Sequence, residues 1–315
     1  MAHRVTLVAN NWQSSDLIAP LDGLLGRLGV KIEWERHDGE SEEALKGLVF
    51  SASKTGVVLM GPRKTPEGER PLSVQIRKGL GLFAQVRHVK NVHGLPARHD
   101  GVDLLVVREI SEDLYTGIEH ESAPGVYESI KLTTKAACER IARFAFEEAR
   151  RGRRKKLTIV HKSNIMKLSD GLLLRTATEV SKRYPEIETE EVIVDALCMK
   201  LVRDPNQFEV LLCGNLFGDI VSDLAAGLAG GSLSGGTVSH GDGIALFESG
   251  SCDGECDPTA LLFEAVKLLR HLGEDEAGLE LAVALAETLK SGVRSKAGGG
   301  DASTAELFKG VSDRL

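Results

Sequence analysis

RVTLVA, at residues 4–9, begins the segment that indicates the fold class, and TGVVLMGP, at residues 55–62, ends it. Both are short apolar runs typical of buried strands, and VKIEWERH at residues 30–37 is a third. The segments between them have the amphipathic spacing of helices: DLIAPLDGLLGRLG (16–29) and EEALKGLVFSA (42–52). Strand, helix, strand, helix, strand predicts a parallel sheet with helical crossovers, and therefore an α/β fold.

The middle of the chain predicts a second group of elements. VDLLVVRE (102–109) reads as a strand and leads into an irregular stretch at residues 120–134. A strong amphipathic helix follows at residues 135–151, and the next strand is KKLTIVHKS (155–163).

The end of the chain returns to helices. The glycine-rich run at residues 230–243 marks a boundary, and two long helices are predicted after it, at residues 258–273 and 276–292. The first sheet needs covering helices, and these late helices can supply them. We therefore predict a discontinuous large domain, 1–98 plus 241–315, and a small domain, 99–240.

Composition excludes several classes of protein. The chain has 315 residues, 42% of them hydrophobic, and a net charge of −7, which argues against broad nucleic-acid binding. No apolar run approaches the roughly 20 residues of a membrane span, and the N-terminus lacks the apolar run of a secretory signal. Five cysteines, an odd number, argue against a disulfide framework. We therefore expect a cytoplasmic protein with no nucleic-acid or membrane partner.

A pair of aspartates in the run LLCGNLFGDIVSDLAAGL is the strongest sign of chemistry. Asp219 and Asp223 are four residues apart, so on a helix both carboxylates lie on one face. Oxygen ligands of this kind suit Mg²⁺ or Mn²⁺. Ile220, Val221 and Leu224 predict a largely buried helix, beside which an unpaired charge is costly. Two aspartates on a solvated face are the alternative, and spacing alone leaves both open.

Two further polar groups stand in apolar surroundings. Lys162 follows directly on the apolar strand LTIV, and the end of a buried strand is a favoured functional position in open parallel sheets. A solvent-facing loop lysine is the alternative. Arg77, Arg87 and Arg108 lie in apolar segments, so their guanidinium groups need anionic partners such as substrate carboxylates. Structural ion pairs are the alternative for these arginines.

Together these segments resemble the β-decarboxylating dehydrogenases, the family of isocitrate, homoisocitrate and 3-isopropylmalate dehydrogenases. The resemblance runs from about Gly61 to the C-terminus and rests on RKGLGLFAQVR, VVREISEDLYTGIEHE, ERIARFAFEEAR, HKSNIMKLSDGLLL and NLFGDIVSD. ERIARFAF and TGIEHE are closer to the isocitrate and homoisocitrate branches. The resemblance implies a two-domain α/β fold with a central mixed sheet, and not a Rossmann fold with a GxGxxG motif.

The resemblance assigns substrate and metal binding. Arg77, Arg87 and Arg108 match the arginines that hold the substrate's carboxylates. Asp219 and Asp223 match aspartates that bind the family's divalent metal, Mg²⁺ or Mn²⁺.

The resemblance also assigns the proton-transfer groups. Tyr115 matches the tyrosine that protonates the enol after carbon dioxide leaves. Lys162 matches the lysine that takes part in proton transfer from the substrate hydroxyl, and Asp195 matches a metal ligand and proton-relay aspartate. In this family the last two reach into the partner subunit's site, so the resemblance implies a homodimer with shared active sites.

The cofactor region departs from the family pattern. The loop after the first strand reads ANNWQSSD in place of Gly-Asp-Gly-Ile-Gly-Pro-Glu, and the loop ESGSCDGECDPTA is several residues short. An aspartate in that loop would repel the 2′-phosphate of NADP, so NAD is favoured. Cys252 and Cys256 are either ordinary thiols in a turn or a metal or redox pair. The positions that the resemblance assigns to the cofactor are Thr65, Gly250, Ser251, Asp253 and Asp257.

The substrate loop departs as well. Isocitrate enzymes carry a Ser-x-Asn pair just before the first arginine, whereas TPEGERPLSVQIR places Pro71 and Ser73 there. We expect Ser73 to bind substrate, and an unusual 3-substituted malate fits this loop as well as isocitrate does.

The sequence therefore predicts a metal-dependent, NAD-linked enzyme that oxidatively decarboxylates a 3-substituted malate to a 2-oxo acid. The alternative from another class is a non-catalytic regulatory subunit or pseudoenzyme of an isocitrate dehydrogenase-type complex. The altered cofactor loops favour the alternative. The complete set of proton-transfer and metal residues, Tyr115, Lys162, Asp195, Asp219 and Asp223, opposes it.

Overall fold

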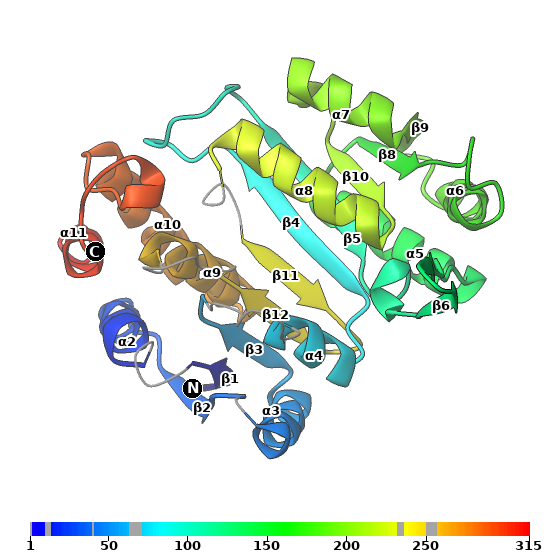
Figure 1. Ribbon diagram of the computed structural model, residues 1–315. Coiled ribbons are helices and arrows are strands. Elements are labelled where there is room, and N and C mark those ends of the chain that lie inside the picture. The colour runs from blue at the N-terminus through cyan, green and yellow to red at the C-terminus, as the bar shows by residue number, and fades with distance from the viewer. Residues whose placement is uncertain (1, 10–13, 40, 63–70, 232–235, 250–256) are drawn as a thin grey trace. The chain divides into compact units, whose positions relative to one another are not determined.

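The computed structural model describes residues 2–9, 14–39, 41–62, 71–231, 236–249 and 257–315 (Figure 1). The chain divides into two units. Unit 1 contains Met1–Gly81, Asn91–Ala97 and Ser232–Leu315, and unit 2 contains Leu82–Lys90 and Arg98–Gly231. Residues 82–90 belong to unit 2 because they contain a strand that pairs along its whole length with the next strand of that unit. The domain division expected from the sequence, at residues 98 and 240, stays a prediction.

Unit 1 is built on strands of mixed direction. In sheet order these are β2 (Ile32–His37), β1 (His3–Val8), β3 (Val57–Met60), β12 (Ala245–Glu248) and β11 (Thr237–His240). The first four run parallel, and β11 runs antiparallel to β12. The helices are α2 (Ala19–Arg27), α3 (Glu42–Thr55), α4 (Leu72–Gly79), α9 (Pro258–His271), α10 (Asp275–Lys290) and α11 (Thr304–Ser312). The strand and helix order predicted for residues 4–62 is confirmed.

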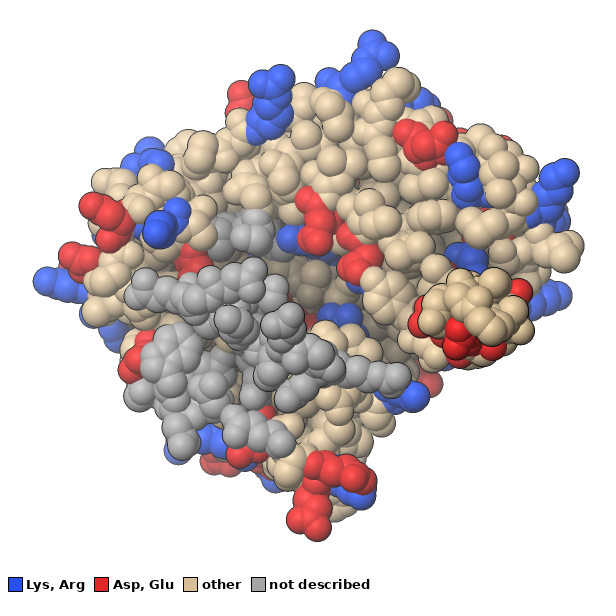
Figure 2. Space-filling model, in the orientation of Figure 1, with Lys and Arg blue, Asp and Glu red and all other residues tan. Residues whose placement is uncertain are grey.

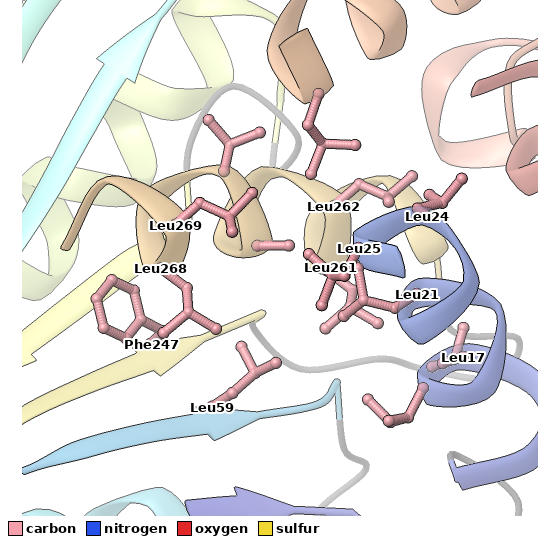
Figure 3. Close-up of a cluster of buried hydrophobic side chains, with 14 of the residues drawn as sticks. Leu17, Leu21, Leu24, Leu25, Leu59, Phe247, Leu261, Leu262, Leu268 and Leu269 are labelled. Carbon is pink, nitrogen blue, oxygen red and sulfur yellow. The ribbon is translucent and has the colours of Figure 1, made fainter. Parts of the chain in front are cut away.

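The core of unit 1 joins elements from both ends of the chain. Figure 3 shows leucines of α2 and α9 pointing toward one another and toward side chains from the strands, among them Leu59 and Phe247. Leu21 and Leu261 are fully buried within this cluster. Burying an aliphatic side chain contributes roughly 1.5–3 kcal/mol. The C-terminal helices therefore complete the unit that the N-terminal strands begin.

Unit 2, like unit 1, is built of strands of mixed direction and helices. Its strands, in sheet order, are β4 (Ala84–Lys90), β5 (Asp103–Glu109), β10 (Val210–Cys213), β8 (Lys156–His161) and β9 (Glu188–Ile193). β4 runs antiparallel to β5, and the other neighbours run parallel. The helices are α5 (Lys135–Arg151), α6 (Ser169–Ser181), α7 (Val194–Arg203) and α8 (Asn215–Ala229). An α/β fold with strands of mixed direction, as the sequence predicted, is confirmed.

Both faces of the unit 2 strands are buried. Along β5, Leu105 and Val107 pack with α5 and α6, whereas Leu104 and Val106 pack in the cluster that includes residues of α7 and α8. Successive side chains of a strand point to opposite faces, so a continuous apolar run is what a strand covered on both sides requires. The polar residues that follow such strands in the sequence therefore lie at the ends of the strands.

Residues 120–134, which the sequence indicated as irregular, contain most of an exposed hairpin. β6 (Glu119–Ala123) pairs antiparallel with β7 (Val126–Ser129), and every residue of both strands is exposed. Gly125 makes the turn with a φ of 77°, a conformation that glycine adopts without strain. These strands could not be predicted from the sequence because the two share no buried face, and so show no alternation of apolar residues.

The surface mixes both signs of charge. Figure 2 shows lysines and arginines interspersed with aspartates and glutamates on the face drawn, as expected for a chain with 39 Lys and Arg residues and 46 Asp and Glu residues. Among the described helices, none has the length and apolar character needed to cross a membrane.

The packing of unit 1 predicts that the substitution of leucine by alanine changes the free energy of unfolding by different amounts at two positions. Leu261→Ala removes a fully buried side chain of α9, so it should lower the free energy of unfolding by roughly 2–5 kcal/mol. Leu279→Ala, at a position of α10 that is 57% exposed, should change it by less than about 0.5 kcal/mol. Urea unfolding followed by circular dichroism measures both, and equal effects would contradict this packing.

Candidate active site

Helix α8 carries the two aspartates that the sequence singled out. It begins at Asn215, directly after β10, and its inner face packs through residues such as Val221. Asp219 and Asp223 lie one turn apart on its other side, with side chains 42% and 77% exposed. Ile220 is 53% exposed, so the expectation that it packs into the core is wrong. A helix turns about 100° per residue, which places Ile220 on the same side as the two aspartates.

Arg108 lies buried beneath α8. It comes from β5, and its Nε and Nη2 donate to Asn215 Oδ1 at 2.9 and 2.7 Å. Its Nη1 donates to Asp219 and, at 3.4 Å, to Gln85 Oε1. The helix passes over the arginine at Gly218, where a Cβ would lie 2.6 Å from Arg108 Cγ. The buried guanidinium group is therefore held on several sides and directed at Asp219.

Tyr115 shares the carboxylate of Asp219 with Arg108. Its hydroxyl donates to Asp219 Oδ2, and its ring centre lies 4.9 Å from the guanidinium carbon of Arg108. Burial and the hydrogen bond to Asp219 raise the pKa of Tyr115, so the phenol is protonated at neutral pH. The carboxylate of Asp219 thus accepts hydrogen bonds from a fixed cation, Arg108, and from a protonated phenol, Tyr115.

A second ion pair lies next along the helix. Arg87 Nη1, on β4, is 2.5 Å from Asp223 Oδ1, and the arginine side chain is 11% exposed. Two predicted substrate arginines therefore meet two predicted metal aspartates. The structural ion pairs that the sequence left open as an alternative are present, while each aspartate keeps part of its surface exposed.

Lys162 and Asp195 form a separate pair. Lys162 follows β8, Asp195 stands in the first turn of α7, and Lys162 Nζ is 2.5 Å from Asp195 Oδ1. This hydrogen bond lowers the pKa of Asp195, so its carboxylate is ionised at neutral pH. Within the part of the chain that is described, no three His, Cys, Asp or Glu residues are grouped closely enough to hold a metal. Within one copy of the chain, Asp195 therefore does not form a metal-binding group with Asp219 and Asp223.

Arg77 and Ser73 stand on α4 of unit 1. Arg77 Nε and Nη2 donate to the two carboxylate oxygens of Glu248 at 3.0 and 2.8 Å. Glu248 is buried, and it also accepts a hydrogen bond from Ser239 at 2.8 Å. This bidentate pair fixes α4 to β12. Ser73 is partly exposed in the first turn of the same helix, and the substrate roles of both residues stay predictions.

Residues 35–311 match the family described as isocitrate/isopropylmalate dehydrogenase. The chain belongs to this family. The NAD isocitrate dehydrogenase regulatory subunit 1 of Arabidopsis thaliana is 40% identical, covering 99% of this chain and 89% of the relative. The subunit beta of Homo sapiens is 37% identical over 99% and 86% of the two chains. The crystal structure of isocitrate dehydrogenase from Methylococcus capsulatus is 34% identical, with a TM-score of 0.89 over 99% of both chains.

These relatives confirm the predicted family and correct one prediction. The Arabidopsis and human proteins are both named as mitochondrial, so the predicted cytoplasmic location is wrong. The prediction failed because cysteine content reports redox conditions rather than a compartment. The same names describe subunits, one of them regulatory, and the homodimer stays a prediction.

The family's cofactor positions fall mostly outside the described residues. Thr65, Gly250, Ser251 and Asp253 lie there, as do Cys252 and Cys256. Asp257 is described and caps α9, accepting a hydrogen bond from Thr259 N at 2.8 Å and another from the Ser295 hydroxyl. Both of its oxygens thus have partners in unit 1, and its contact with the cofactor remains a prediction.

Two residues of the site were missed by sequence reasoning. Asn215 is 1% exposed and supplies the oxygen that holds Arg108, and its amide donates to the Glu112 carbonyl at 2.9 Å. Gly218 leaves the space through which Arg108 passes. Both stand in the run NLFGD that the sequence singled out. A polar residue directly after a buried strand, and a glycine inside a helix, were the available signals.

The two aspartates of α8 fit a divalent cation as part of its ligand set. Carboxylates one helical turn apart offer oxygen ligands on one face, and Mg²⁺ is commonly held by one or two carboxylates plus water and substrate. Asp219 and Asp223 remain partly exposed, so a cation can approach them.

The passage of Arg108 beneath α8 predicts opposite outcomes for two glycines of that helix. Gly218→Ala should lower the free energy of unfolding by about 1–3 kcal/mol, because its Cβ would overlap the stem of Arg108. Gly227→Ala meets nothing within 4 Å, so it should be neutral or raise stability by up to about 1 kcal/mol. Urea unfolding midpoints compare the two, and a harmless Gly218→Ala would contradict the described contact.

Proposed function

We propose that this chain catalyses the NAD-linked oxidative decarboxylation of isocitrate or a closely related 3-substituted malate. The observation that carries the proposal is the convergence of Arg108 and Tyr115 on Asp219, with Arg87 and Asp223 one helical turn away. This arrangement offers cations for substrate carboxylates, a proton donor, and oxygen ligands for a metal. The names of the relatives support isocitrate and NAD.

The arginines would hold the substrate. A dicarboxylate needs two cations, and Arg87 and Arg108 are fixed by the strands β4 and β5 that carry them. Each donates to one aspartate of α8. In the proposed complex Asp219 and Asp223 would hold the cation, and the guanidinium groups would donate hydrogen bonds to the carboxylates of the substrate. Positioning of this kind converts an encounter of separate molecules into reaction within one complex.

The reaction requires two proton transfers. Loss of the substrate's hydroxyl proton lets hydride leave carbon for nicotinamide, which gives a β-keto acid. Cleavage of the neighbouring carbon–carbon bond releases carbon dioxide, and the resulting enol takes a proton on carbon. We assign the first transfer to Lys162 with Asp195 and the second to Tyr115, whose raised pKa keeps its proton available at neutral pH. A bound Mg²⁺ or Mn²⁺ would act as a Lewis acid that stabilises negative charge on the substrate oxygen.

The separation of Lys162 from Asp219 supports a shared site. Lys162 pairs with Asp195 and not with the cluster on α8, whereas the proposed chemistry needs both. A second subunit that supplies its own Lys162 and Asp195 would meet this need. That subunit is a second copy of this chain or a different subunit of the same family.

A regulatory subunit is the second candidate function. Its support is the word "regulatory" in the name of the Arabidopsis relative. Against it, Tyr115, Lys162 and the aspartates of α8 are all present, and Tyr115 already contacts Asp219. Assaying the purified chain with a panel of 3-substituted malates, with NAD and with NADP, separates the two candidates.

Tyr115→Phe should lower kcat by roughly 10²- to 10⁴-fold, the usual contribution of a positioned acid. Because the tyrosine acts after hydride transfer, a burst of up to one reduced nicotinamide per site should remain. Rapid-mixing absorbance measures both. Tyr127→Phe, at a position of the hairpin that is 76% exposed, is the control. A Tyr115→Phe enzyme that turns over at the normal rate would refute the assignment.

Asp219→Asn should weaken Mn²⁺ binding at least about 10-fold, because loss of an outer-sphere partner alone costs that much. Electron paramagnetic resonance of free Mn²⁺ measures the affinity without relying on turnover. Asp257→Asn, which alters the cap of α9 in unit 1, should leave Mn²⁺ binding unchanged. Wild-type affinity in Asp219→Asn would remove Asp219 from the metal site.

Mixed subunits test the shared site. Tyr115→Phe and Lys162→Met chains should each be inactive alone and regain activity when refolded together, because one of the two sites in a mixed dimer is intact. Activity of a chain shown by ultracentrifugation to be monomeric would contradict the shared site.

A further inference from the structure

A buried ion-pair chain connects the turn that carries Tyr115 with the loop that carries Lys162. At its centre Lys131 Nζ is 2.8 Å from Asp113 Oδ2 and 3.4 Å from Asp170 Oδ1. The lysine side chain is 17% exposed, and each carboxylate is 5% exposed. A cation shared by two carboxylates at this depth holds all three groups in place, since removing it leaves like charges buried together.

The Asp113 end holds the turn of Tyr115. Asp113 has φ 74° and ψ −154°, a region that is essentially confined to glycine and persists only where the surroundings impose it. Its Oδ1 accepts from Leu114 N at 2.8 Å, and its Oδ2 accepts from Leu216 N at 3.2 Å. The carboxylate therefore ties the short helix η2 (Leu114–Thr116) to the first turn of α8, where Asp219 follows.

The Asp170 end holds the loop of Lys162. Asp170 stands in the first turn of α6, and its Oδ2 accepts from the backbone N of Lys162 at 2.7 Å. The backbone of Lys162 is thereby fixed at the end of β8, while its side chain reaches Asp195. Lys131 thus pairs with two carboxylates, and each carboxylate contacts one of the two segments that carry the proposed proton-transfer groups.

Lys131, Asp113 and Asp170 line a recess in unit 2, and the other acidic groups that line it have partners of their own. Glu109 accepts from Ser111 and from the backbone N of Glu112, and Glu112 accepts from Thr134. These carboxylates are engaged by N–H and O–H donors of neighbouring turns. The recess is therefore organised around Lys131 rather than as a site for an added cation.

We propose that Lys131, with Asp113 and Asp170, is a positioning residue that fixes Tyr115 and Lys162 at the same time. The consequence for turnover rests on the proposed function, in which Tyr115 serves the chain's own site and Lys162 serves the partner's. In that arrangement the ion-pair chain joins two active sites through the interior of one subunit. Loss of the shared lysine therefore loosens both segments together, whereas loss of one carboxylate loosens only the segment that it holds.

Amide hydrogen exchange of the full-length protein tests the linkage without relying on activity. Lys131→Met should speed exchange in residues 111–117 and in residues 161–170, by roughly 10- to 100-fold, the factor that a charged hydrogen bond represents. Asp113→Gly fits the backbone conformation, so this variant should fold, and it should speed exchange in residues 111–117 alone. Lys156→Met, which breaks a more exposed pair with Glu190, is the matched control and should change neither segment.

Turnover distinguishes failure of the linkage from failure of the proposed function. Lys131→Met should lower kcat roughly 100-fold, as a small misplacement of reacting groups does, with little change in KM for the substrate. If Lys131→Met does not fold, the double variant Lys131→Met with Asp170→Asn removes the cation without adding buried charge and is used in its place. Exchange changes in both segments of a protein with no dehydrogenase activity would support the linkage and refute the proposed function. Unchanged exchange in residues 161–170 would overturn the linkage, whatever the activity.

Discussion

Arg108 carries a permanent positive charge into a position where its side chain is 6% exposed, and that charge must be met by the residues around it. Asn215 and Asp219 meet it from the first two turns of α8, and the helix can lie close enough because residue 218 is a glycine. The same carboxylate then receives Tyr115. The path of α8, the position of Asp219 and the place of the tyrosine all follow from satisfying one buried cation.

The sequence predicted the parts of this site that depend on local geometry. Asp219 and Asp223 share a helix face because their spacing is four, and Arg108 needed an anion because its strand is apolar. It could not say which anions the arginines meet, since the pairs Arg77–Glu248 and Arg87–Asp223 join residues 171 and 136 positions apart. Such pairs depend on strand order, which local periodicity does not encode.

Other features escaped prediction for different physical reasons. The exposed hairpin around Gly125 buries no face, so it shows no alternation of apolar residues. Asp113 occupies a backbone conformation that its residue type would not predict, and contacts from distant segments, Lys131 and α8, help to hold it there. Ile220 lies with the aspartates on the exposed side of α8, although its side chain is hydrophobic. In each case the packing of distant segments outweighed local preference.

Strands β4 and β5 fix the cations of this site and helix α8 presents the carboxylates, and we propose that this arrangement performs oxidative decarboxylation. The most direct measurement uses the purified chain alone with isocitrate, NAD and Mn²⁺, and follows reduced nicotinamide and carbon dioxide in the same sample. Both products should form in equal molar amounts through many turnovers. A chain that forms neither product, yet raises the turnover of an added catalytic subunit, would contradict it.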